Sequence, residues 1–173
     1  GAGAVPVAKP PAQVEAARAL AEQRFETLSR ELAERPPGAD VDGFWLEEQL
    51  RAILEIDAGH AAARFNLGVV YEARGDVASA RGAYEQAGAQ GGERFVPATE
   101  NLARLLLRGG DAAQAVAIWQ RNIDADPKNQ TSRLALARLR AAARAYDEAI
   151  ALCRQVLQQQ ADATEAFRIL AAS

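Results

Sequence analysis

The sequence predicts an all-α fold in which helical hairpins stack in tandem, as a solenoid rather than around one globular core. A dipeptide of leucine followed by glycine or alanine returns at intervals of 35, 34 and 34 residues. Its copies are Leu67-Gly68, Leu102-Ala103, Leu136-Ala137 and Leu170-Ala171. Such a period is typical of stacked helical repeats. Composition agrees, because about a quarter of the residues are alanine, a strong helix former, and no alternating Val/Ile/Thr-rich segment predicts a strand.

Each repeat contains a second recurring pair, in which an alanine is followed four residues later by a larger side chain. The pairs are Ala80 with Tyr84, Ala115 with Trp119 and Ala149 with Cys153. Turns precede the first two pairs, at Gly75-Asp76 and Gly110-Asp111. Glycine tolerates the positive φ of a helix C-terminus, and aspartate can cap the helix that follows. Each repeat is therefore expected to be two helices joined by a tight turn, with small residues that let the paired helices approach closely.

Together these residues resemble the tetratricopeptide repeat family, whose units are helix-turn-helix pairs of about 34 residues. The resemblance covers residues 61–173 and implies a right-handed superhelix of about three full repeats and a C-terminal half repeat. The implied units are 61–95, 96–129, 130–163 and a partial unit at 164–173. The chain departs from the family pattern at Arg64, Thr99 and Arg133, where the family favours a large aromatic residue.

The segment before the clear repeats, residues 12–60, is expected to form a degenerate N-terminal helix pair. An apolar stripe predicts a helix over about residues 12–35, which a Pro-Pro-Gly run then ends because proline offers no backbone donor. Asp40 or Asp42 can cap a second helix over about residues 41–56. The alternative interpretation of this segment is a separate dimerising hairpin.

Composition limits the partners and the setting. The net charge is −3 and the pI about 5.3, so nucleic acid is not an expected partner, and no apolar run is long enough to span a membrane. The 18 arginines against two lysines are typical of a GC-rich bacterial genome. Residues 1–11 are rich in Gly, Ala, Pro and Val and are expected to form a flexible tether, either to a lipid anchor outside the chain or as an ordinary linker. A periplasmic or outer-membrane-associated setting is favoured over the cytoplasm.

The residues that most often carry chemistry are too few here to predict catalysis. The single histidine, His60, is expected in a surface turn, without the further His or Cys ligands that a metal site needs. The single cysteine, Cys153, takes the place of Tyr84 and Trp119 and is expected to be a buried packing residue. We expect no enzyme, no metal and no cofactor.

The family resemblance implies a concave groove lined by the first helix of each unit. Its expected lining is Phe65, Asn66, Val69 and Glu72 in the first unit, Glu100, Asn101, Arg104 and Arg108 in the second, and Leu134, Ala135 and Arg138 in the third. Asn66 and Asn101 can pair with a peptide backbone or bond locally. The three arginines would form a basic strip that binds carboxylates, or a solvated face. Phe65 and Val69 would seat an apolar side chain.

These expectations favour a scaffold that binds an extended peptide or a partner protein, within a bacterial envelope assembly. A chaperone-tail receptor is excluded, because Phe65 and Val69 stand where that class places a lysine and an asparagine. The alternative function is homo-oligomerisation of a larger protein, through residues 12–35 or the C-terminal edge of the repeat array.

Overall fold

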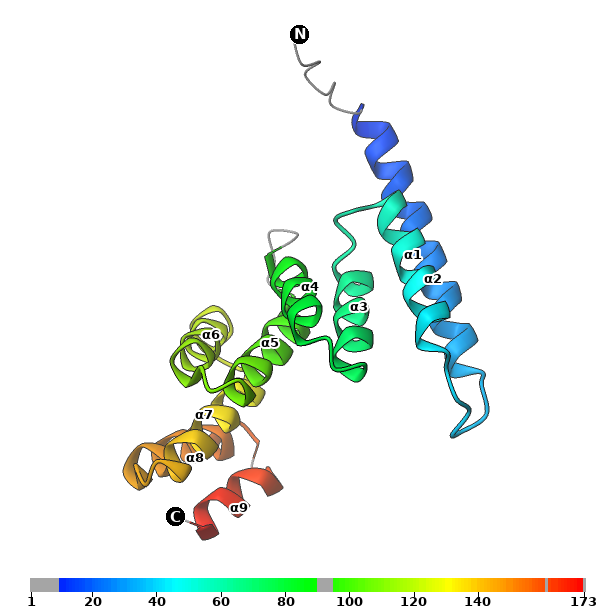
Figure 1. Ribbon diagram of the computed structural model, residues 1–173. Helices are drawn as coiled ribbons and strands as arrows, with labels where there is room; N and C mark the ends of the chain where they lie inside the picture. The colour runs from blue at the N-terminus through cyan, green and yellow to red at the C-terminus, as the bar shows by residue number, and fades with distance from the viewer. Residues whose placement is uncertain (1–9, 90–94, 161, 173) are drawn as a thin grey trace, which may run out of the picture. The chain divides into compact units, whose positions relative to one another are not determined.

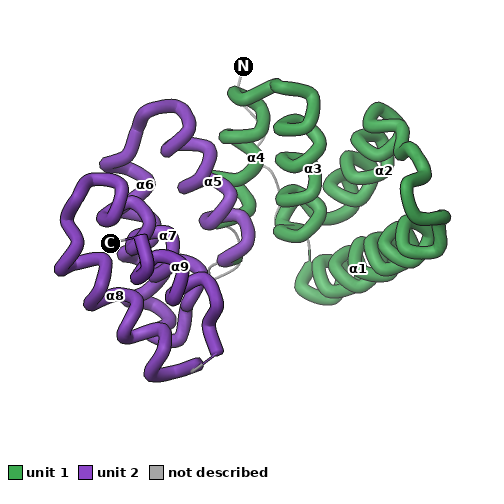
Figure 2. Tube along the Cα trace, turned by 90° about the horizontal axis from the view of Figure 1, so that it is seen from below, with its two compact units in different colours: residues 1–95 green, residues 96–173 purple. Residues whose placement is uncertain are grey.

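The computed structural model describes residues 10–89, 95–160 and 162–172, which form nine α-helices and no strand. The helices are α1 (Pro11–Ala33), α2 (Gly43–Ile56), α3 (Ala61–Ala73), α4 (Val77–Ala89), α5 (Val96–Arg108), α6 (Ala112–Ala125), α7 (Gln130–Ala142), α8 (Tyr146–Gln159) and α9 (Thr164–Ala172). None of these described helices combines the length and the apolar character needed to cross a membrane. The chain divides into two compact units, which end and begin at Phe95 and Val96 (Figure 2).

The first hairpin of unit 1 consists of α1 and α2, which lie side by side and run in opposite directions (Figure 1). Helix α1 begins at Pro11, because proline is tolerated where the backbone N–H would be unpaired, so the last residue of the predicted tether is already helical. Of the other predicted tether residues, Pro10 is described and residues 1–9 lie outside the described residues. Helix α2 begins two residues later than predicted, because Asp42 rather than Asp40 caps it, accepting a 2.8 Å bond from the Phe44 N–H.

One apolar core joins this hairpin to α3. Its buried members are Ala21, Leu28, Leu50, Ile53, Leu54, Ala63, Leu67 and Val70. They come from the inward stripes of α1, α2 and α3, which recur every three or four residues along each helix. Because α2 packs against both α1 and α3, the N-terminal helix pair and the first repeat share a single hydrophobic interior.

The hairpin of α3 and α4 is held at close range by a glycine and an aromatic ring. Tyr84 of α4 is fully buried and lies against Gly68 of α3, so that a Cβ atom at Gly68 would come within 2.5 Å of the tyrosine Cε1. The Tyr84 hydroxyl donates a 2.7 Å hydrogen bond to Glu72, also on α3. The tyrosine therefore packs within its own helix pair, and the small residue opposite it sets how closely the helices approach.

The turns inside the hairpins follow the predicted chemistry in two cases and depart from it in the third. Gly75 and Gly110 have φ angles of 79° and 89°, and the aspartates that follow them cap α4 and α6 as predicted. The equivalent position between α7 and α8 is Arg144, with φ at 61°. A side chain in this left-handed region costs about 1–2 kcal/mol, so the third turn is strained where the first two are not.

Unit 2 repeats the hairpin in α5–α6 and α7–α8, followed by α9. The core of its C-terminal part is formed by Ala137, Ala149, Cys153, Val156, Ala163, Ala166 and Ile169. Trp119 of α6 is also buried, at 1% exposure. The three residues that follow the repeated alanines by four, Tyr84, Trp119 and Cys153, are thus all buried, as the repeat pattern predicts.

Substitution of Gly68 by alanine tests the close approach of α3 and α4. The added Cβ would overlap a fully buried ring, so we expect Gly68→Ala to lower the free energy of unfolding by about 1–3 kcal/mol. Gly82→Ala is the matched control, since a Cβ there meets nothing within 4 Å. This substitution replaces a glycine in a helix interior and is expected to stabilise the fold by about 0.5–1 kcal/mol. Urea unfolding followed by circular dichroism measures both. Equal stability of the two variants would contradict the packing argument.

Candidate functional site

The same register position is exposed on the first helix of three successive hairpins. It lies two residues after the repeated leucine and is occupied by Val69 on α3, Arg104 on α5 and Arg138 on α7. Val69 is 40% exposed, and the Arg138 side chain is 60% exposed. Since the leucine itself is buried in each helix, its neighbour two positions along is directed to solvent by helical geometry. The position is apolar in unit 1 and cationic in unit 2.

The surface of α3 combines this exposed valine with an aromatic cluster. Phe65, one turn before Val69, is half-buried, with ring centroids 5.8 Å from Tyr84 and 5.7 Å from Phe95. The amide of Asn66 donates a 2.8 Å bond to the Ala62 carbonyl one turn earlier. One amide hydrogen of Asn66 is therefore engaged locally, which matches the local alternative left open by the sequence.

In unit 2, exposed arginines lie on the first helices α5 and α7. Asn101 accepts a hydrogen bond from Arg104, one turn further along α5, and Arg108 follows one turn later and is exposed. On α7, Arg138 forms a 2.8 Å ion pair with Glu165 of α9. The arginine side chains are thus presented from two first helices of one unit, each from an exposed position.

Glu100 does not belong to the predicted groove lining, which is a correction to the sequence interpretation. It is 8% exposed and accepts hydrogen bonds from Trp119 Nε1 at 2.9 Å, from Asn122 Nδ2 at 3.3 Å and from the Ser132 hydroxyl. These donors come from α6 and α7, so the carboxylate ties three helices together. A spacing argument places Glu100 where Phe65 lies, but the indole N–H and the hydroxyl draw it inward.

His60 is likewise buried, at 7% exposure, and the prediction of a surface-turn histidine is wrong. Its Nδ1 caps α3 by accepting a 3.1 Å bond from the Ala63 N–H. Its ring packs 4.9 Å from the ring of Phe25 on α1, and Nε2 lies 3.2 Å from a Glu22 carboxylate oxygen without the alignment of a hydrogen bond. The histidine therefore acts as a cap and a packing residue.

Sequence reasoning missed a charged cluster where α2 meets α3. Glu47 accepts hydrogen bonds from Tyr71 of α3 and from Arg74, the C-cap of that helix, and pairs with Arg51 of its own helix at 2.7 Å. The Arg74 hydrogen bond is the main cause that holds the pKa of the Glu47 carboxyl below its ordinary value, with further lowering by Arg51 and Tyr71, while burial acts in the opposite direction. Arg74 also stacks on the 74%-exposed Phe44, 3.9 Å from the ring centroid. Only the Glu47–Arg51 spacing is readable in the sequence.

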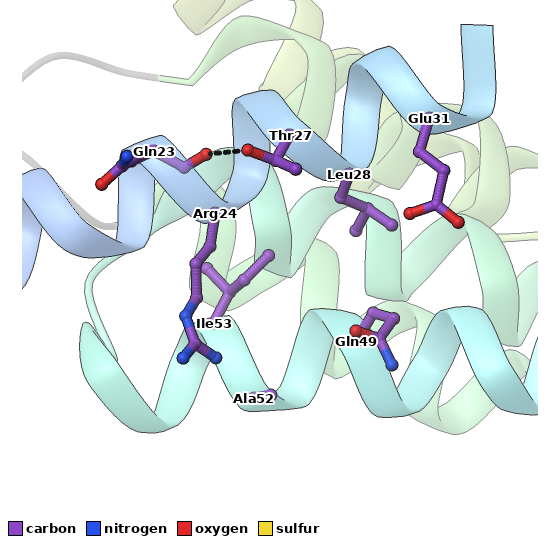
Figure 3. Close-up of a pocket in the computed structure, with 8 residues that line it drawn as sticks. All are labelled: Gln23, Arg24, Thr27, Leu28, Glu31, Gln49, Ala52 and Ile53. Carbon is purple, nitrogen blue, oxygen red and sulfur yellow. Dashed lines mark hydrogen bonds between the residues drawn. The ribbon is translucent and has the colours of Figure 1, made fainter. Parts of the chain in front are cut away.

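A polar depression of about 320 Å³ lies between α1 and α2 (Figure 3). Its lining is Gln23, Arg24, Thr27, Leu28, Glu31, Gln49, Ala52 and Ile53. The Thr27 hydroxyl donates to the Gln23 carbonyl at 2.9 Å, so that hydroxyl is engaged within its own helix. The depression combines one cation, one carboxylate and amides, a composition suited to weak polar contacts.

Among the described residues, no three His, Cys, Asp or Glu side chains are grouped so that they could hold a metal ion. Cys153 is fully buried, and burial is the main cause that raises the pKa of its thiol, with a smaller contribution from Glu165. A buried thiol with a raised pKa is a poor nucleophile, because the thiolate is the reactive form.

Comparison with known families gives one match. The sequence pattern described as Tetratricopeptide repeat matches residues 47–93 and 100–166, which together make up more than half of the chain. No curated protein matches the chain.

Several solved structures share the fold. A tetratricopeptide repeat protein from Parabacteroides merdae ATCC 43184 matches with a TM-score of 0.70 and 18% identity over 91% of this chain, which spans 59% of that protein's length. MamA matches with a TM-score of 0.59 and 18% identity over 69% of each chain. YrrB, described as a TPR protein with an unusual peptide-binding site, matches with a TM-score of 0.55 and 20% identity, covering 94% of this chain and 74% of the other. The predicted all-α fold class of helical hairpins is confirmed.

The Glu47 cluster predicts a pH-dependent stability difference. Because the folded-state pKa is lowered, the cluster stabilises the protein above the ordinary glutamate value of 4.5 and loses this effect as pH falls through the folded-state value. Glu47→Gln is expected to reduce the free energy of unfolding by about 1 kcal/mol near neutral pH, and by progressively less below pH 4.5. Glu48→Gln is the control, since it changes the same charge at an exposed neighbour outside these bonds. A Glu47→Gln effect that stays constant with pH in urea titrations would refute the assignment.

Proposed function

The chain belongs to the tetratricopeptide repeat family, and from this premise we propose that it is a protein-interaction module that binds an extended peptide or a partner protein on the first helices of its repeats. The proposed contact residues are Phe65, Asn66 and Val69 in unit 1 and Asn101, Arg104, Arg108 and Arg138 in unit 2. The observation that carries the proposal is the exposure of one register position on α3, α5 and α7. The peptide-binding site named for YrrB, a protein of the same fold, supports it as an analogy.

The unit 1 surface suits an apolar side chain of a bound peptide. Val69 lies one turn from Phe65, whose ring is held by Tyr84 and Phe95, so an incoming side chain meets an ordered aromatic edge and an exposed valine. Burying such surface contributes about 25 cal/mol per Å², which for a single side chain is of the order of 1–3 kcal/mol. The module is proposed to bind and not to catalyse, since the contacts described around it are packing and hydrogen-bonding contacts.

We also propose that the setting is a bacterial envelope assembly. The excess of arginine over lysine supports a bacterial source, and the Gly/Ala/Pro/Val composition of residues 1–11 supports a tether. Detection of the native protein in membrane or periplasmic fractions checks this proposal, and a purely cytosolic distribution contradicts it.

Selection from a displayed library of random peptides tests the binding function. We expect the full chain to enrich peptides whose affinity falls about tenfold or more with Val69→Glu, since a carboxylate at this position opposes burial of an apolar side chain. Val77→Glu is the matched control, because Val77 is 56% exposed and lies on α4, a second helix. Failure to enrich any peptide, or an equal loss in both variants, would refute the proposed surface.

Self-association is a second candidate function, favoured by two exposed apolar side chains. Leu20 on α1 is 44% exposed, and Phe167 on α9 is 53% exposed. If either helix forms a contact between copies, light scattering is expected to give the mass of a dimer that falls to a monomer with Leu20→Glu or Phe167→Glu. A wild-type monomer at all concentrations measured would exclude this function.

A further inference from the structure

Charge is segregated by helix in unit 2. The first helices α5 and α7 together contain five arginines and one carboxylate, whereas the second helices α6 and α8 contain two arginines and three carboxylates. This basic pair of helices belongs to a chain with a net charge of −3. We propose that α5 and α7 bind an acidic, extended peptide segment of a partner protein. The proposal rests on the proposed function and names the chemistry of the partner.

The one carboxylate on these two helices does not offset their surface charge. Glu100 is 8% exposed and its oxygens accept bonds from Trp119, Asn122 and Ser132. A carboxylate held by several donors inside the protein is satisfied there and is not offered to a ligand. The bond from Ser132 to Glu100 also joins α7 directly to α5, so the two basic helices are held together within the unit.

Two of the five arginines are used inside the α7–α8 hairpin. Arg140 forms a 2.9 Å ion pair with Glu148 of α8. Arg133 is 6% exposed, and its Nε donates a 3.2 Å bond to the neutral amide of Gln155. That bond leaves the positive charge of Arg133 in place, where it adds to the potential of α7.

The other three arginines form the proposed binding surface, which consists of Arg104, Arg108 and Arg138. Arg104 and Arg138 occupy the same register position on α5 and α7, and Arg108 lies one turn beyond Arg104. An extended chain that passes along both helices can therefore present carboxylates to each in turn, and the guanidinium fork binds carboxylates in a bidentate manner.

The ion pair of Arg138 with Glu165 does not prevent this binding. The two side chains are 60% and 30% exposed, and exposed pairs contribute only about 0–1 kcal/mol. A peptide carboxylate can replace Glu165 at small cost and leave Glu165 solvated. Glu165 thus occupies the position on Arg138 that a carboxylate of the ligand would take.

The surface suits an acidic peptide better than nucleic acid. Protein–DNA contacts of useful affinity neutralise about 6–10 phosphates, whereas this surface offers three exposed arginines. The remaining acidic charge of the chain would also repel a long polyanion at a distance. A short segment with two or three carboxylates matches the number of exposed arginines on this surface.

Fluorescence polarisation with labelled extended peptides tests the inference on the full chain. The probes are a peptide of alternating Glu and Ser, its counterpart with Lys for Glu, an apolar peptide selected by the Val69 surface, and a labelled single-stranded DNA. We expect the Glu probe to bind at least about tenfold more tightly than the Lys probe, and to weaken as salt is raised, because screening acts on exposed charges. Arg104→Glu with Arg138→Glu is expected to abolish this preference.

The control variant, Arg121→Glu with Arg154→Glu, makes the same change of net charge on α6 and α8 and is expected to retain the affinity. Arg104→Gln with Arg138→Gln is a milder second variant should the first fail to fold, as judged by circular dichroism. Equal affinity for the Glu and Lys probes, an equal loss in the variant and its control, or tighter binding of single-stranded DNA would overturn the inference. If the apolar probe still binds in a Val69-dependent manner, the proposed function stands alone; if no probe binds, both fail.

Discussion

The close approach of paired helices at a small residue is the constraint on which the rest of this structure depends. Where Tyr84 packs against Gly68, the ring occupies the space that a side chain at position 68 would fill. This contact fixes which face of α3 is buried and therefore which positions are left in solvent. Exposure of Val69 is a consequence of that packing, because Val69 lies two residues after the buried Leu67 and therefore points away from the face that α4 covers.

The hairpin tolerates different chemistry at its inner positions as long as the volume is filled. In unit 1 an aromatic pair, Phe65 and Tyr84, meets by ring contact. In unit 2 the same two register positions hold Glu100 and Trp119, which meet through a buried hydrogen bond. A polar group can take part in a helical interface when every donor around it finds an acceptor, and here a second and a third helix supply those partners.

The elements that sequence reasoning predicted well are those specified by local rules. The helix pairs, the glycine turns and the aspartate caps depend on residues within one or two turns of each other, so their spacing carries the information. Burial of Tyr84, Trp119 and Cys153 follows from their shared place in the repeat. The contact residues on the first helices remain predictions, since they depend on a partner. The predicted domain boundaries also remain predictions.

What could not be predicted depends on side chains brought together from separate helices. Nothing near Glu100 in the sequence indicates that an indole N–H and a serine hydroxyl converge on it. The same holds for Glu47, whose partners Tyr71 and Arg74 lie on the next helix and at its C-cap. In each case a carboxylate that looks like surface charge in the sequence is an internal acceptor. Its donors come from other parts of the chain and are brought together only by folding.

The imidazole of His60 makes two contacts that serve different helices. Asn129 caps α7 with the same acceptor geometry that His60 uses for α3, so capping alone does not require a ring. The ring is needed for the contact with Phe25, which seats α1. The start of α3 and the packing of α1 therefore both depend on the same side chain. Replacement of this one buried side chain would therefore remove the cap of α3 and the ring contact with α1 at the same time.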